Sequence, residues 1–206
     1  MLGLVFATPD EAAPFVERIT GGERPDNLEE GCHVEAHDVV VTVTGPGKIK
    51  AAIGVERFLR QHDVDTLVHA GGATALTDDL ELGTLVGATF VLEGDRVALD
   101  TPTYPRMPLD PLPDLSTEGA LVSQDHTNDG DSEERSYWER IADLRDDTGY
   151  PVAYVAAQHG TTCHIVKGVT GRVDTEDPSS VRRKAYQAVA SFLRNHVETT
   201  VDGGSA

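Results

Sequence analysis

The chain has little lysine, little cysteine and few aromatic residues. Its 206 residues include 4 lysines and 13 arginines against 20 aspartates and 15 glutamates, which gives a formal charge of −18. A field of this sign repels nucleic acid phosphates and anionic lipid headgroups, so the sequence predicts neither a nucleic acid nor a membrane as partner. Because the acids are scattered through the chain and form no separate tail, we expect the salt-adapted surface of a halophile's protein.

The two cysteines, Cys32 and Cys163, lie far apart, and neither stands in a Cys-x-x-Cys or Cys-His-rich neighbourhood. Both are therefore predicted to be small core residues, and no metal ion or other cofactor is expected. No apolar run is long enough to cross a membrane, and the opening residues lack the basic start of a signal peptide. The sequence thus predicts a cytoplasmic protein.

Short apolar segments alternate with segments of helical periodicity, which predicts an α/β fold. We expect a three-layer helix–sheet–helix sandwich with a mixed central sheet, as one domain over residues 1–200 with a flexible tail over 201–206. Prolines predict a surface loop over 101–115, and acidic residues predict an exposed loop or flap over 125–134. The expected strands cover 1–6, 32–37, 39–44, 65–70, two pieces within 80–95 on either side of Gly87, 119–123 and 162–169, and the expected helices begin at Pro9 and cover 49–62, 149–159 and 181–196.

Three of these strands run into glycine-rich or capping turns, and ligands gather at such strand ends in α/β sheets. The first turn is Thr8-Pro9-Asp10-Glu11, the second holds Gly47, and the third is Gly71-Gly72-Ala73-Thr74. Backbone N–H groups of the third turn suit an anion or a water molecule, although a tight turn alone also explains its glycines.

Six segments, taken in order, resemble the purine and uridine phosphorylase superfamily, and within it the nucleosidases of the methylthioadenosine/S-adenosylhomocysteine type. They are LVFATPDEAAP, VTVTGPGKIKAAIGVERFL, LVHAGGATALTDDLELGTLV, GALVSQD, DDTGYPVAYVAAQHG and CHIVKGVTGRVD. Each motif alone is a weak signal, and the resemblance rests on their order over most of the chain. The resemblance implies the nucleoside phosphorylase-like fold, a nucleoside as the small-molecule substrate, and a homodimer or larger homo-oligomer.

The resemblance also implies roles for individual residues. Glu11 would activate the attacking water, although a carboxylate in a first helical turn also suits the helix dipole. The family's ribose-binding glutamate is Thr148 here, which can hydrogen-bond a ribose but supplies no carboxylate. Asp146 or Asp147 would substitute for the glutamate only if the backbone register shifts, and both are otherwise solvated acids. Further substrate contacts are expected from four residues: Ser123, Asp125, Tyr150 and Lys167.

The family's general acid follows the last strand, where this chain has Thr170-Gly171. Asp174 lies three positions on and is the candidate for a displaced acid. It also suits capping of the last helix.

These assignments predict hydrolysis of a purine N-glycosidic bond through a ribosyl cation-like transition state. Water is favoured over phosphate because no arginine lies in the three turns. A catalytically silent nucleoside binder and a phosphate-dependent phosphorylase remain as alternatives. A dinucleotide site and a serine hydrolase are disfavoured because their glycine motifs are absent, and His33, His37 and His69 are expected to be packing residues and not metal ligands.

Overall fold

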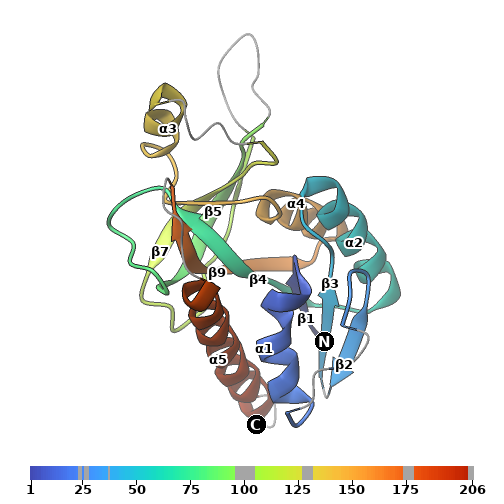
Figure 1. The fold of residues 1–206 in the computed structure, drawn as a ribbon. Coiled ribbons are helices and arrows are strands. Elements are labelled where there is room, and N and C mark those ends of the chain that lie inside the picture. The colour runs from blue at the N-terminus through green and yellow to red at the C-terminus, as the bar shows by residue number, and fades with distance from the viewer. Residues whose placement is uncertain are drawn as a thin grey trace.

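The structure is a computed structural model that describes residues 1–22, 25, 28–36, 38–95, 105–126, 132–173 and 179–203, the last four as backbone only. Figure 1 shows a central sheet between two pairs of helices. The strands are β1 (Leu2–Phe6), β2 (His33–Ala36), β3 (Val39–Val43), β4 (Thr66–Ala75), β5 (Leu85–Glu93), β6 (Arg106–Pro108), β7 (Glu118–Ser123), β8 (Leu144–Asp146) and β9 (Thr162–Arg172). The helices are α1 (Pro9–Ile19), α2 (Lys48–Gln61), α3 (Ser132–Trp138), α4 (Gly149–His159) and α5 (Ser179–Gly203).

The sheet is mixed and partly closed on itself. Its order is β2-β3-β1-β4-β8-β7-β5-β6, and β9 pairs with both β4 and β5. Strands β4, β8, β7, β5 and β9 therefore form a closed ring of pairings. The long strand β4 is parallel to β1 and β9 and antiparallel to β8, so its carboxyl end lies between two partners.

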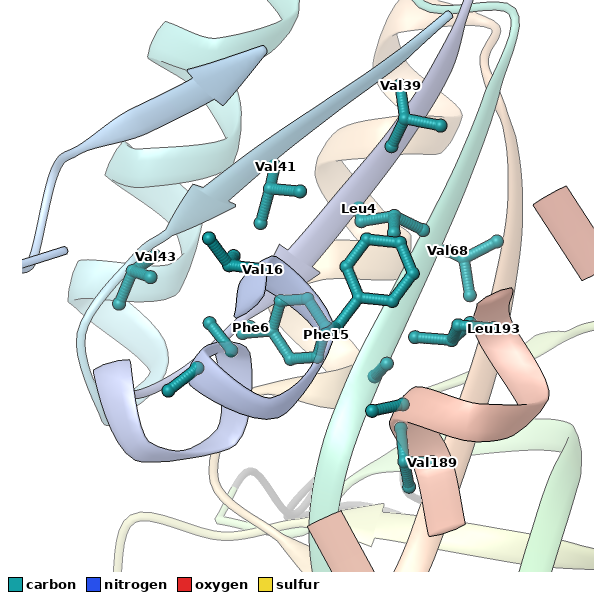
Figure 2. Close-up of a cluster of buried hydrophobic side chains, with 14 of the residues drawn as sticks. Leu4, Phe6, Phe15, Val16, Val39, Val41, Val43, Val68, Val189 and Leu193 are labelled. Carbon is teal, nitrogen blue, oxygen red and sulfur yellow. The ribbon is translucent and has the colours of Figure 1, made fainter. Parts of the chain in front are cut away.

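Helices cover both faces of the sheet, as the alternating pattern predicted. Helices α1 and α5 pack together on one face, and α2 and α4 pack together on the other. Strands β1 and β3 are covered on both faces, and they are almost wholly buried and, apart from Thr42 of β3, without polar side chains. Figure 2 shows the core under α1 and α5, where Phe6 and Phe15 meet side chains from β3, β4 and α5.

The structure differs from the sequence predictions in several short segments. The 101–115 loop contains strand β6, and α3 begins inside the segment predicted as an acidic loop. Strand β5 continues through Gly87, where a break was predicted. Helix α5 runs to Gly203, past the predicted start of the tail at 201, and residues 204–206 lie outside the described part.

Helix α2 leaves two of its isoleucines exposed. Its buried residues are Ala51, Val55 and Phe58, whereas Ile49 and Ile53 are 75% and 48% exposed. In the described part of the chain, no helix is long and apolar enough to span a membrane.

Candidate active site

One cavity of about 520 Å³ lies at the carboxyl ends of β4, β8 and β9, where the start of α1 and the first turns of α5 approach the sheet. Its position follows the rule that ligand sites of α/β folds gather at strand ends. It is lined by Glu11, Gly72, Ala73, Thr74, Gln124, Arg145, Asp146, Asp147, Thr170, Gly171, Arg172, Arg182 and Tyr186.

Glu11 caps helix α1 and also lies in the cavity wall. Thr8 and Glu11 form a capping box at the start of α1, in which Oε2 of Glu11 accepts from the N–H groups of Ala7 (3.1 Å) and Thr8 (3.0 Å). Its other oxygen, Oε1, accepts from Gly72 N (2.8 Å) across the cavity wall. Capping thus orients a buried carboxylate into the cavity, and the two roles are compatible.

The glycine pair at 71 and 72 is part of a strand. The predicted turn there is wrong, because β4 continues to Ala75 and pairs with β9 along the whole segment. Glycine is required at both positions because a side chain would collide with neighbouring atoms. A Cβ at Gly71 would lie 2.5 Å from Oε1 of Glu11, and one at Gly72 would lie 2.7 Å from the Thr170 side chain. The close approach of β4 to α1 therefore depends on the missing side chains.

A buried polar network lies beneath the cavity, around Asp146. Lys167 Nζ is 2.8 Å from Asp146 Oδ2 and 2.8 Å from His69 Nε2. Ser123 Oγ donates to Asp146 Oδ1 (2.6 Å), and His69 Nε2 lies 3.0 Å from Thr148 Oγ1. We call Ser123, His69, Thr148 and Lys167 the buried network. Four polar side chains from four elements thus hold one carboxylate.

The two adjacent carboxyl groups of the cavity have opposite pKa shifts. The pKa of Asp146 is held well below its usual range because the charges of Lys167 and His69, with their hydrogen bonds, outweigh the cost of burial. The pKa of Asp147 is raised, first by burial and then by the negative charge of Asp146. Asp146 is therefore a fixed anion, whereas Asp147 takes up a proton more readily than an ordinary aspartate.

Several predicted site residues line the cavity. They are Glu11, Asp147, Gly72, Ala73 and Thr74. Gly71 packs against Glu11, and Gly47 donates its N–H to Asp147 Oδ2 (2.9 Å). These residues come from four separate segments, and the fold brings them to one place.

Other predicted contacts lie elsewhere. Thr148, Lys167 and Ser123 are buried in the network, contact Asp146 and do not line the cavity, so their direct contact with substrate stays a prediction. Tyr150 packs in the core and stacks on Tyr154, and Asp125 is exposed and accepts from Lys48 N (2.9 Å). Asp174 lies outside the described residues.

His69 and His33 are hydrogen-bonded packing residues, as predicted. His69 is hydrogen-bonded within the buried network, and His33 Nδ1 lies 3.0 Å from His62 Nε2. His37 lies outside the described part. Within that part, no group of three or more His, Cys, Asp or Glu side chains is arranged to hold a metal ion.

Sequence reasoning missed the arginines of the cavity. Arg145, Arg172 and Arg182 reach it from β8, β9 and α5, so the absence of arginine from the three turns did not mean a cavity without arginine. We call these three residues the arginine cluster. Tyr186, one helical turn after Arg182, also lines the cavity, and burial raises its pKa to about 12, so its phenol keeps its proton. No spacing in the sequence relates the three arginines to one another.

Comparison with known proteins shows the family to which the chain belongs. A sequence model of the family described as Phosphorylase superfamily matches residues 1–118, which is over half of the chain, and the chain belongs to this family. Among curated proteins it is similar to the 5'-methylthioadenosine/S-adenosylhomocysteine nucleosidase of Shewanella denitrificans, with 27% identity over 99 residues. The similar stretch covers 46% of this chain and 42% of that nucleosidase, so the chain matches less than half of that relative's length.

Solved structures share the fold over nearly the whole chain. Futalosine hydrolase of Helicobacter pylori superposes with a TM-score of 0.79 and 20% identity, covering 96% of this chain and 97% of that one. The 5'-methylthioadenosine/S-adenosylhomocysteine nucleosidase of the same organism, bound to butyl-thio-DADMe-Immucillin-A, gives the same TM-score, identity and coverage. The predicted nucleoside phosphorylase-like fold is confirmed.

Proposed function

We propose that the protein is a hydrolase that cleaves the N-glycosidic bond of a purine nucleoside. The observation that carries the proposal is the Glu11 carboxylate, held in the cavity wall by backbone N–H groups of Ala7, Thr8 and Gly72. In the reaction, a water molecule attacks the anomeric carbon, the carbon–nitrogen bond breaks, and the base leaves with its bonding electrons. Glu11 accepts the proton of that water.

The acidic groups of the cavity also suit the transition state. Positive charge develops on the ribose as the base departs, and a fixed anion in the wall stabilises it. Asp146 supplies that anion. Among the described residues, the Asp147 carboxyl accepts one hydrogen bond, from Gly47, which leaves its other oxygen to bind a ribose hydroxyl. In this proposal Asp147 takes the role that Thr148 cannot fill.

The experiment is an assay of free base at high salt. Methylthioadenosine, adenosylhomocysteine, inosine, adenosine and futalosine are each incubated with the protein, with and without phosphate. We expect base release from at least one nucleoside in the absence of phosphate. Release that requires phosphate would contradict hydrolysis and assign the protein to the phosphorylases.

A nucleoside-binding protein without turnover is the second candidate. It is favoured by the position of Thr148, which is directed into the buried network, and by Gly171, which has no side chain at the cavity. For such a protein, we expect the same nucleosides to raise its melting temperature without release of free base.

The proposal includes a cytoplasmic homodimer. Support for the dimer comes from the neighbouring helices α2 and α4, on which Ile49, Ile53 and Tyr154 are 75%, 48% and 48% exposed. A second copy would cover these side chains, and sedimentation of the protein tests this. Ile49→Asp should give monomers, and a protein that is already monomeric would contradict the dimer.

We also propose adaptation to high salt, on the basis of 35 acidic against 17 basic side chains. Salt screens the repulsion among these acids, so the folded state should gain stability as KCl rises to molar concentrations. Denaturant unfolding at low and multimolar KCl tests the proposal, and a midpoint indifferent to salt would contradict it.

A further inference from the structure

The Gln124 side chain is a polar group of the cavity wall that the described part of the chain leaves partly unsatisfied. Gln124 follows β7 and lines the cavity, the residue is 5% exposed, and its Oε1 atom has no hydrogen-bond partner among the described residues. Most buried polar side-chain atoms in proteins are hydrogen-bonded, because an acceptor removed from water without a donor destabilises the fold. An exception beside a cavity indicates that a ligand supplies the donor.

The rest of Gln124 is fixed in place by its neighbours. Its backbone N–H donates to the carbonyl oxygen of Asp146 (2.8 Å), and the N–H of Gly94 donates to the carbonyl oxygen of Ser123 (2.9 Å). The Cγ atom of Gln124 lies so close to Gly94 that a Cβ there would be 2.3 Å from it. The backbone and the first part of the side chain are thus held between the ends of β5 and β8, which leaves the amide group at the tip to contact a ligand.

The strand order separates Gln124 from Glu11 along the cavity. Glu11 follows β1 and Gln124 follows β7, and β4 and β8 lie between these two strands in the sheet. Three spacings of about 4.8 Å therefore separate β1 from β7, or roughly 14 Å along the sheet. Asp147 follows β8, so it lies between the other two residues in this order.

This order matches the positions that hydrolysis of a nucleoside requires. When water displaces the base directly, the water and the base lie on opposite faces of the sugar. In the proposed function Glu11 holds the water and Asp147 binds a ribose hydroxyl, so the base extends toward Gln124. The amide of Gln124 is neutral and its oxygen can only accept, which suits a neutral N–H group on the edge of a base.

We propose that Gln124 determines which base the cavity accepts. Its Oε1 atom accepts a hydrogen bond from an N–H group of the base, so the substrates are purine nucleosides with such a group, as adenine has in its amino group and hypoxanthine in N1–H. The inference rests on the proposed function and adds the residue that selects the base. A purine without an N–H group would leave the oxygen of Gln124 buried and unpaired, and sites of this kind discriminate against a ligand that lacks the donor.

The first experiment is calorimetric titration with carbocyclic nucleosides. Their rings have a CH2 group in place of the ribose oxygen, so they form no ribosyl cation and are not cleaved during the measurement. The probes are the carbocyclic forms of adenosine, inosine and purine riboside, and the last has the same hydroxyl groups but no N–H group on its base. Gln124→Met keeps the length of the side chain without the acceptor. Gln61→Met is the matched control, because Gln61 is an exposed glutamine at the end of α2 and does not line the cavity.

We expect carbocyclic adenosine or inosine to bind the wild type at least about ten times more tightly than carbocyclic purine riboside. Gln124→Met should abolish this preference, and Gln61→Met should keep it. The inference is overturned if the wild type binds all three analogues equally, or if the preference survives in Gln124→Met.

Unfolding of the free protein tests whether Gln124 instead serves the fold. Gln124→Met removes a buried acceptor that lacks a donor among the described residues and replaces it with a side chain of similar length. Its midpoint in denaturant should therefore equal or exceed that of the wild type. A glutamine that the fold requires would give a lower midpoint than Gln61→Met, and that result would overturn the inference without any nucleoside.

Failure of this inference and failure of the proposed function give different results. Equal binding of the three analogues, together with base release from ordinary nucleosides, overturns base selection by Gln124 and leaves hydrolysis in place. A preference that is lost in Gln124→Met, without any base release, supports the inference and favours a binding protein over an enzyme. Absence of both binding and base release overturns both.

Discussion

The cavity has two walls of different construction. The first comes from residues 1–118, which match the family model, and presents Glu11 and the backbone of Gly72 to Thr74. The second comes from β8, β9 and α5, beyond the matched residues, and presents two aspartates and the arginine cluster. The first wall is held by backbone hydrogen bonds and close packing of glycines, and the second by a buried charge network. The difference shows that two walls of one cavity can be held by different kinds of interaction.

The largest expected effect concerns the second wall. Lys167→Met removes the partner of a carboxylate that is 4% exposed, and an uncompensated buried charge costs about 3–5 kcal/mol of unfolding free energy. Denaturant unfolding measures this. Lys50→Met is the control, because the Lys50–Glu30 pair is half-exposed, and its loss should cost at most about 1 kcal/mol. Equal effects of the two substitutions would show that the network does not hold the second wall.

A smaller effect is expected from the first wall. Gly71→Ala places a Cβ 2.5 Å from Glu11 Oε1, so the carboxylate must move, at a cost of about 1–3 kcal/mol, and base release should fall with it. Gly160→Ala is the control, since Gly160 also has a positive φ of 72° but no atom lies near its Cβ position. That variant should lose stability and keep activity. Unchanged activity in Gly71→Ala would mean that the position of Glu11 does not matter.

The smallest expected effect concerns the titration of Asp147. Its pKa is higher in the folded than in the unfolded protein, so the fold loses stability as pH rises through the unfolded value of about 4 toward the folded one. Asp147→Asn removes this loss. The variant should melt slightly above the wild type at pH 7, and the difference should vanish below pH 4. The quantity to compare is the melting temperature of the variant minus that of the wild type. If this difference is lower at pH 7 than at pH 3, the assigned pKa shift is contradicted.

Much of the fold was predictable from the sequence because its signals are local. Thr8 and Pro9 identified the start of α1, the β-branched run identified β3, and Gly149 to His159 gave both ends of α4. The three-residue strands β6 and β8 were missed because they are too short to show a period. Hydrophobicity alone also does not distinguish the exposed Ile49 of α2 from a core residue.

The site was predictable only in its first wall. Glu11 lies in the first turn of the helix that follows β1, Gly72 lies on β4, and their meeting follows from the parallel pairing of β1 and β4. The second wall depends on contacts between distant residues, such as Lys167 with Asp146, and on arginines whose spacing has no regular pattern. Asp146 in particular resembled any other acid of a chain with 35 of them until its buried partners were known.

The central claim is that Glu11 activates water in the cavity, and the most direct measurement compares base release by Glu11→Gln and Thr8→Ala. Both substitutions weaken the capping box of α1, and each should cost about 1 kcal/mol of stability. Only Glu11→Gln removes the carboxylate, so it should slow base release at least about 100-fold while Thr8→Ala retains it. Equal activity in the two variants would show that Glu11 is only a cap and would contradict the proposed mechanism.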